Sequence, residues 1–197
     1  RKESALLAII STPAFGQGDV GVQLGNSTID ADLSDATTHD DSDTSFKLFG
    51  GIPLNNLFAV EVGGIDFGSY NAYYSSYDVH EDVEATALYA AILLRPQISQ
   101  SVHLLAKAGL SRWSGDYRAS GSVISGYGSG DGVDPMYGVG IEYNPTASIS
   151  VRAEWERYTD IFDGVSSSLW DIYGNSVSDD MDGLDIDVAG ISVAYRF

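Results

Sequence analysis

Apolar and non-apolar side chains alternate along most of this 197-residue sequence. The last eight residues, GISVAYRF, show the pattern clearly, with an apolar or aromatic side chain at every second position: Ile191, Val193, Tyr195 and Phe197. A period of two places these side chains on one face of a β-strand, whereas an amphipathic helix needs a period of 3.6. The sequence therefore predicts an all-β fold.

Eight stretches carry this alternation. They cover residues 20–25, 46–52, 58–62, 86–95, 102–113, 136–144, 148–158 and 184–197. The connections between them alternate in size. Short connections rich in Pro and Asn lie at 53–56, 96–100 and 144–147, and long ones rich in Ser, Gly, Asp and Tyr lie at 27–43, 68–85, 114–134 and 159–183. Short turns on one rim and long loops on the other predict an antiparallel up-and-down sheet, and closing it into an eight-stranded barrel removes its edges.

The two faces of these strands indicate what surrounds the barrel. The face opposite the apolar one carries glycines and a few charges of both signs: Glu61, Gly138, Gly140, Glu142, Arg152 and Glu154. This mixture suits a narrow interior, and aromatic side chains fall near the predicted strand ends, as in the aromatic girdles of membrane barrels. A transmembrane β-barrel is therefore predicted. The alternative is a soluble barrel that binds a ligand inside an apolar lumen.

Four stretches resemble the OmpA-like transmembrane domain, a family of eight-stranded outer-membrane barrels. They are SFKLFGGIPLNNLFAVEVGGIDFG (45–68), LLAKAGLSRWSGD (104–116), YGVGIEYNPTASISVRAEWERY (137–158) and ISVAYRF (191–197). The resemblance implies a location in a Gram-negative outer membrane, among lipid and lipopolysaccharide, with short periplasmic turns and four long extracellular loops. It also implies that the barrel-assembly machinery recognises the final strand through Ile191, Val193, Tyr195 and Phe197. Larger family members add a peptidoglycan-binding domain, which we do not expect in this chain.

Residues 1–16 read as a signal peptide, and residues 17–197 as the barrel domain. Arg1 and Lys2 precede the apolar run ALLAII (5–10), and small residues precede a cleavage point after Gly16. The run is far shorter than the ~20 residues that a membrane-spanning helix needs. The alternative interpretation of this segment is an apolar first strand.

Strand parity directs several charges toward the barrel interior. They are Glu61, Lys107, Glu142, Arg152 and Glu154. An ion without a partner away from bulk water costs several kcal/mol, so we expect these side chains to form one network of ion pairs. The network has two interpretations. It is either a plug that fills the lumen or a gate that passes small solutes when its members exchange partners.

The charge balance excludes some function classes. The chain has 28 acidic and ten basic residues, a formal net charge of −18 and no cysteine. Nucleic acid is not expected as a partner, because its phosphates require a basic surface. Most acidic residues lie in the predicted loops, where they are expected to form a solvated, mutually repulsive fringe. The alternative is weak binding of divalent cations by HDDSD (39–43) and DDMDG (179–183), although neither has EF-hand spacing.

No enzymatic or cofactor site is expected. The histidines are His39, His80 and His103, and none belongs to a recognisable arrangement with a nucleophile. The sequence instead predicts a structural or surface-interaction role for an outer-membrane barrel that displays acidic loops. A narrow diffusion pore gated by the interior charges is the alternative.

Overall fold

A computed structural model describes residues 17–30, 38–40, 42–74, 79–121, 124–163, 166–171, 176–180 and 183–197. Its longest strands are β1 (Asp19–Asp30), β3 (Ser42–Pro53), β4 (Phe58–Tyr74), β5 (Val79–Leu94), β7 (Val102–Gly121), β8 (Ile124–Tyr143), β9 (Ile149–Ile161) and β12 (Leu184–Arg196). The short strands are β2 (Thr38–Asp40), β6 (Gln97–Ser99), β10 (Ser166–Asp171) and β11 (Ser176–Asp180). Within these ranges, no helix is long and apolar enough to cross a membrane.

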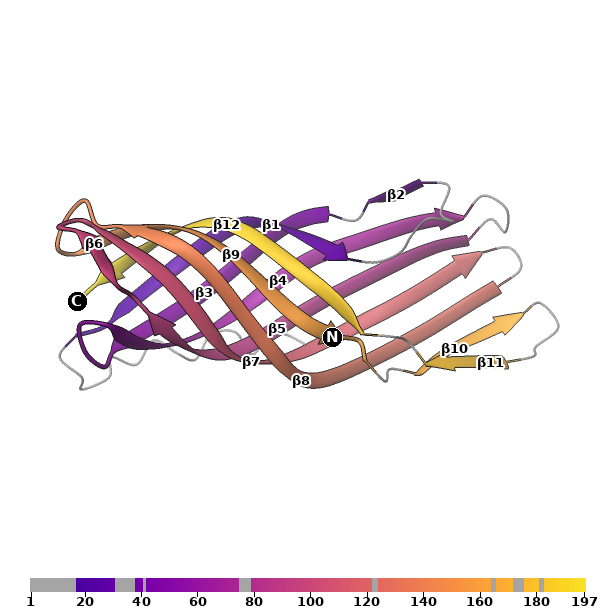
Figure 1. Cartoon of the computed structure of the whole chain (residues 1–197). Helices are drawn as coiled ribbons and strands as arrows, with labels where there is room; N and C mark the ends of the chain where they lie inside the picture. Colours follow the sequence, from indigo (N-terminus) through magenta and orange to yellow (C-terminus); the bar gives the residue numbers. More distant parts are fainter. Residues whose placement is uncertain are drawn as a thin grey trace.

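The eight long strands form one closed, antiparallel, up-and-down barrel (Figure 1), which confirms the predicted fold class. Each long strand pairs with its neighbour along the chain, and β12 returns to pair with β1 from Asp19↔Arg196 to Asp30↔Asp185. Backbone bonds between Gly18 and Phe197 extend this closing seam by one more step, at 3.1 and 3.0 Å. A closed barrel satisfies the backbone polar groups of its strands without leaving a sheet edge, as a membrane requires.

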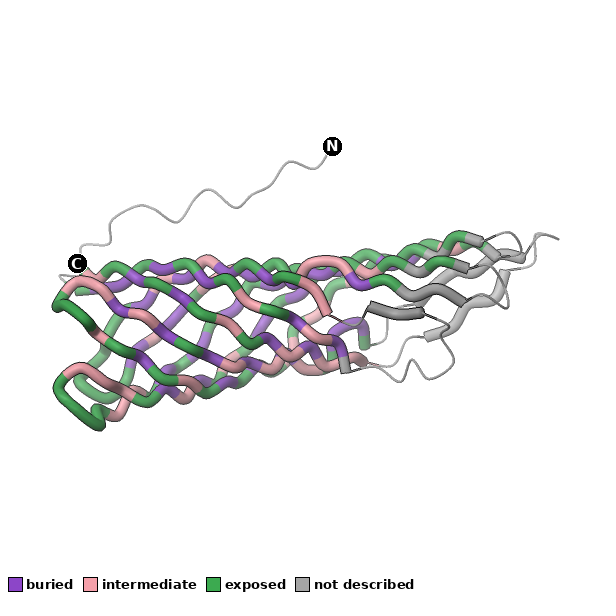
Figure 2. The backbone as a smooth tube through the Cα atoms, turned by 90° about the horizontal axis from the view of Figure 1, so that it is seen from above, coloured by how far each residue is buried: buried purple, intermediate pink, exposed green. Residues whose placement is uncertain are grey.

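Burial alternates along every barrel strand (Figure 2), as the period-two pattern predicts. The exposed side chains form an apolar outer surface that includes Leu24, Leu88 and Ile191, each at least 60% exposed. On a closed barrel, such a surface faces lipid. The side chains of the opposite face point into the barrel interior. The apolar face therefore points outward, and the soluble-barrel alternative is wrong.

The strands extend further than the sequence pattern predicts. β4 and β5 remain paired out to Tyr74↔Val79, and β7 and β8 remain paired out to Ser120↔Ser125. Most of the loops predicted at 68–85 and 114–134 are therefore β-ribbons that project beyond the barrel, opposite the C-terminus in Figure 1. The prediction failed there because Ser, Gly and Asp have weak strand propensity, whereas cross-strand pairing holds the ribbons together.

The other two predicted long loops are described only in part. In the segment 159–183, β10 pairs with both β11 and the outer end of β8. In the segment 27–43, β2 pairs with β4. Residues 1–16 lie outside the described residues, so the signal peptide stays a prediction.

The barrel interior has two zones of different chemistry. Charged and polar side chains fill the zone nearer the short turns, whereas the zone nearer the ribbons is an apolar core. The larger members of this core are Phe67, Tyr70, Trp113, Met136, Tyr158, Ile161, Phe162 and Ile186. The sequence predicted a lumen of small and charged residues, which describes only the first zone.

Candidate functional site: the interior charge network

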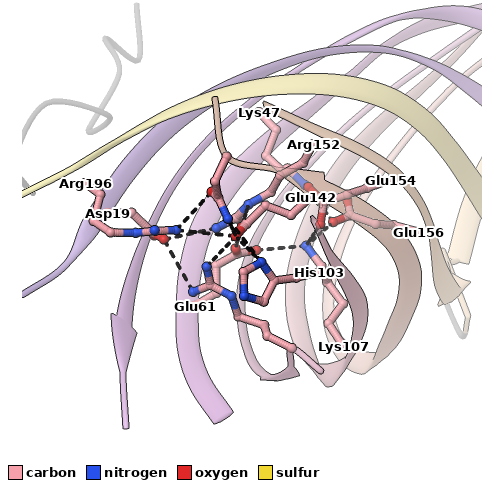
Figure 3. Close-up of polar contacts among 12 residues, drawn as sticks. Asp19, Lys47, Glu61, His103, Lys107, Glu142, Arg152, Glu154, Glu156 and Arg196 are labelled. Carbon is pink, nitrogen blue, oxygen red and sulfur yellow. Dashed lines mark hydrogen bonds and ion pairs between the residues drawn. The ribbon is translucent and has the colours of Figure 1, made fainter. Parts of the chain in front are cut away.

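The five charged residues predicted for the lumen all lie inside the barrel. Glu61, Lys107, Glu142, Arg152 and Glu154 are at most 5% exposed. Each alternates with outward-facing neighbours, so the same parity that builds the lipid-facing surface directs these charges inward. The structure brings the five together in two connected clusters (Figure 3).

Arg152 organises the cluster nearer the short turns. Its Nε donates a hydrogen bond to Glu142 Oε2 at 2.8 Å, its Nη1 to Glu61 Oε2 at 2.8 Å, and its Nη2 to Asp19 Oδ2 at 3.0 Å. Its guanidinium carbon also lies 4.9 Å from the centroid of the Phe49 ring, a cation–π contact. All three nitrogens of the guanidinium group are therefore used, which is the geometry in which a buried arginine is best stabilised.

Glu142 has further partners at the end of the barrel that carries the short turns. Arg95 Nη2 donates to its Oε1 at 2.7 Å, and Arg196 Nη2 lies 3.3 Å from the same oxygen. The Asn144 amide donates to this oxygen at 3.2 Å and also lies 3.1 Å from Nδ1 of His103. His103 therefore lies at the edge of the network.

Two lysines organise the second cluster. Lys107 Nζ lies 2.8 Å from Glu61 Oε1, 2.7 Å from Glu154 Oε1 and 2.6 Å from Glu156 Oε1. Lys47 Nζ lies 2.6 Å from Glu156 Oε1 and 3.8 Å from Glu154 Oε2. Glu61 joins the two clusters because one of its oxygens contacts Lys107 and the other contacts Arg152.

Two tyrosine hydroxyls complete the second cluster. Tyr89 donates to Glu61 Oε1 at 2.8 Å, and Tyr158 donates to Glu156 Oε2 at 3.1 Å. The ring of Tyr158 meets Phe67 edge-on, with centroids 4.9 Å apart. These tyrosines therefore connect the charged zone of the lumen to the apolar zone beyond it.

Sequence reasoning missed several members of the network. Lys47 follows the same parity as the predicted residues, since Phe46 on the preceding position faces outward, and Glu156 continues the inward series of Arg152 and Glu154. Applying the same alternation to every position of the two strands would have assigned both residues to the interior. Asp19 and Arg95 also have inward parity, next to outward-facing Val20 and Leu94, but they lie at the limits of the alternating stretches, where a strand begins or has just ended.

The network is electrically balanced and spans the lumen. In the described chain it contains five cations, Lys47, Arg95, Lys107, Arg152 and Arg196, and five anions, Asp19, Glu61, Glu142, Glu154 and Glu156. Arg152 on β9 and Glu61 on β4 come from strands on opposite sides of the eight-stranded ring. Direct ion pairs therefore cross the interior at its charged zone.

The four residues of the predicted assembly signal lie on the outer face of β12. Ile191, Val193, Tyr195 and Phe197 are 64%, 48%, 53% and 49% exposed. Their side chains belong to the apolar surface, while the backbone of the same strand closes the barrel on β1. This position is compatible with recognition of the strand before closure.

Of the two acidic clusters predicted to bind divalent cations, Asp41, Met181 and Asp182 lie outside the described residues. The Asp43 carboxylate of the first cluster accepts backbone hydrogen bonds from Thr44 and Ser69. Among the residues that are described, no group of three or more histidine, cysteine, aspartate or glutamate side chains is arranged to hold a metal ion.

The fold, the outward apolar surface and the charged interior define an integral β-barrel protein of the Gram-negative outer membrane. More specifically, the chain belongs to the outer membrane protein β-barrel domain family, which it matches over residues 4–197. This membership confirms the predicted class of protein and its location. No sequence among the curated proteins is close enough to count as a match.

Solved structures share the fold at low sequence identity. Ail, the attachment invasion locus protein of Yersinia pestis, is 17% identical with a TM-score of 0.56, and the alignment covers 92% of this chain and 99% of Ail. Neisserial surface protein A is 14% identical with a TM-score of 0.59, covering 92% and 99%. OprG from Pseudomonas aeruginosa is 13% identical with a TM-score of 0.56, covering 91% and 96%. At these identities the likeness establishes the fold alone.

Proposed function

We propose that this protein reinforces the outer membrane and presents an acidic surface to the exterior, with its lumen closed by the interior charge network. The observation that carries this proposal is the ion pair between Arg152 and Glu61, which joins opposite strands at 2.8 Å. Eight strands enclose an interior just wide enough for side chains, so a pair across it leaves little room for solute. The role is structural and interactive rather than catalytic.

The projecting ribbons support the surface role. Their outward faces carry exposed carboxylates, including those of Asp66, Glu84, Asp116 and Asp131. Glu84 and Asp116 lie directly opposite each other on β5 and β7, a like-charge pair that is unfavourable in isolation. The ribbons would therefore attract cationic partners, including divalent cations that bridge to the phosphates of lipopolysaccharide. The outward face of β12 is the proposed contact for the barrel-assembly machinery.

Conductance in planar lipid bilayers tests the closed lumen. Purified protein is first checked by gel mobility with and without boiling, since a folded, detergent-resistant barrel migrates differently from the unfolded chain. We expect no stepwise conductance from samples that show this mobility shift. Reproducible single-channel steps would contradict a closed lumen.

One observation favours the narrow pore as a second candidate. Lys107 Nζ lies within 2.8 Å of carboxylate oxygens from three residues, so it can exchange partners without leaving an ion pair broken. A pore of this kind would open intermittently, and neutralising Lys107 would change the frequency of opening. Steps that persist unchanged in Lys107→Met would argue against a gate built on this residue.

A further inference from the structure

The turn after β9 enters the outer end of the barrel. β9 ends at Ile161, and the next residue, Phe162, is 1% exposed. The Phe162 ring packs against Trp113 with centroids 5.4 Å apart. It also occupies space that Gly115 leaves open, since a Cβ on Gly115 would lie 2.4 Å from Phe162 Cζ. The chain thus turns inward and places one phenyl ring inside the barrel, against the inner face of β7.

This ring lies well beyond the charge network, toward the extracellular side. On β7 the network residue is Lys107, whereas Trp113 and Gly115 lie six and eight residues further along the same strand. The outward-facing residues at that level, Ser114 and Asp116, are polar and exposed. The ring therefore lies at the extracellular mouth, beyond the apolar outer surface.

The backbone of this turn is strained. Asp160 and Phe162 have φ values of 55° and 71°, a left-handed conformation that aspartate tolerates but that is unfavourable for phenylalanine. The turn has few backbone anchors: Asp163 N–H donates to Asp160 O at 3.2 Å, and Asp160 N–H donates to Asp185 Oδ1 at 3.3 Å. Both lie at or beyond the long end of the usual range, so the turn is held mainly by burial of the Ile161 and Phe162 side chains, of which Ile161 also pairs with Leu184 on β12.

We propose that residues 160–163 form a lid at the extracellular mouth, with the Phe162 ring as its latch. Strain favours release of the turn, and burial of the Ile161 and Phe162 side chains opposes it, which makes a two-state element. The lid closes the lumen at a second level, independently of the charge network. Its opening exposes the apolar zone around Trp113 to the exterior while the ion pairs below stay in place.

Single cysteines test this proposal, because the chain has no cysteine of its own. Ala85 is 2% exposed, faces inward and pairs with Gly115, so Ala85→Cys reports on the space next to the ring. Ala91 is 4% exposed on the same strand, pairs with Gly109 at the level of the network, and serves as the matched control. A membrane-impermeant maleimide is applied to folded protein in lipid vesicles, and gel mobility verifies that the barrel stays closed.

We expect Ala85→Cys to react slowly but completely with the lid intact, and on the order of 100-fold faster when combined with Phe162→Ala. This factor is the fold-change that corresponds to the smallest free-energy cost expected when a buried phenylalanine is replaced by alanine. Ala91→Cys should stay protected in both backgrounds. Complete protection of Ala85→Cys with the lid intact, an unchanged rate in Phe162→Ala, or parallel labelling of Ala91→Cys would each overturn the lid.

Discussion

Replacing Arg152 by alanine is the most informative perturbation of the charge network. The substitution removes hydrogen bonds to Asp19, Glu61 and Glu142 and leaves four cations facing five anions. Removing one partner of a buried ion pair costs about 3–5 kcal/mol. Because Glu61 keeps Lys107 and Glu142 keeps Arg95, the loss should lie near the lower limit, at about 3 kcal/mol.

Arg112 provides a matched control on the outer surface. It pairs with Asp131 at 3.2 Å, but the two side chains are 70% and 61% exposed. Exposed pairs contribute about 0–1 kcal/mol, because water screens them. Arg112→Ala should therefore leave the free energy of unfolding almost unchanged, although it removes the same side chain.

Reversible unfolding in urea from lipid vesicles, followed by tryptophan fluorescence, measures both variants. A second experiment combines Arg152→Ala with Glu61→Gln, and the double-mutant cycle gives the coupling energy between the two side chains. We expect a coupling of at least about 1 kcal/mol, in the range found for residues in one network. Equal effects of Arg152→Ala and Arg112→Ala, or additive effects in the cycle, would refute the view that these ion pairs hold the interior together.

Three further predictions concern other parts of the barrel. Lys47→Met should lower the free energy of unfolding less than Lys107→Met. In Lys47→Met, Glu156 still pairs with Lys107, whereas Lys107→Met removes an ion-pair partner from three carboxylates. Urea unfolding compares the two variants, and the reverse order would contradict this ranking. Gly109→Ala should impair folding, because the new Cβ would lie 2.1 Å from Ala90 O. Gly50→Ala should fold normally, because its Cβ would make an ordinary contact with Asp19 O at 3.5 Å. The gel mobility assay compares the two variants. Phe197→Ser should slow assembly in cells without slowing folding into vesicles; equal slowing in both would argue against a role as an assembly signal.

The alternation of side chains allowed most of the fold to be predicted. It marked eight strands, assigned Glu61 and Arg152 to the interior and assigned Val193 to the outer surface, because strand geometry fixes the side of each residue as soon as one neighbour is known. The alternation did not reveal the extent of the strands. In the ribbons, the sequence of Ser, Gly and Asp resembles a loop, and only the pairing of β7 with β8 shows that Tyr117 and Gly128 belong to strands.

Which residues form ion pairs within the lumen could not be predicted without the closed barrel. Parity places Arg152 and Glu61 in the interior but does not show that they meet, since they are 91 residues apart and on strands that share no backbone bond. Their contact depends on the number of strands, their tilt and the resulting width of the barrel. The assignment of Glu154 illustrates this point: parity placed it in one network with Arg152 and Lys107, and only the structure shows that its ion pairs are with the two lysines.

The sequence by itself thus determined the eight barrel strands within the membrane, their two faces and the membrane environment, because these depend on local geometry and on the polarity of neighbouring residues. The tertiary structure alone decided which ions pair across the lumen, where the charged interior gives way to an apolar core and where Phe162 packs against Trp113. Those features depend on contacts between residues distant in the chain, and such contacts exist only once the strands have closed into a barrel of defined width.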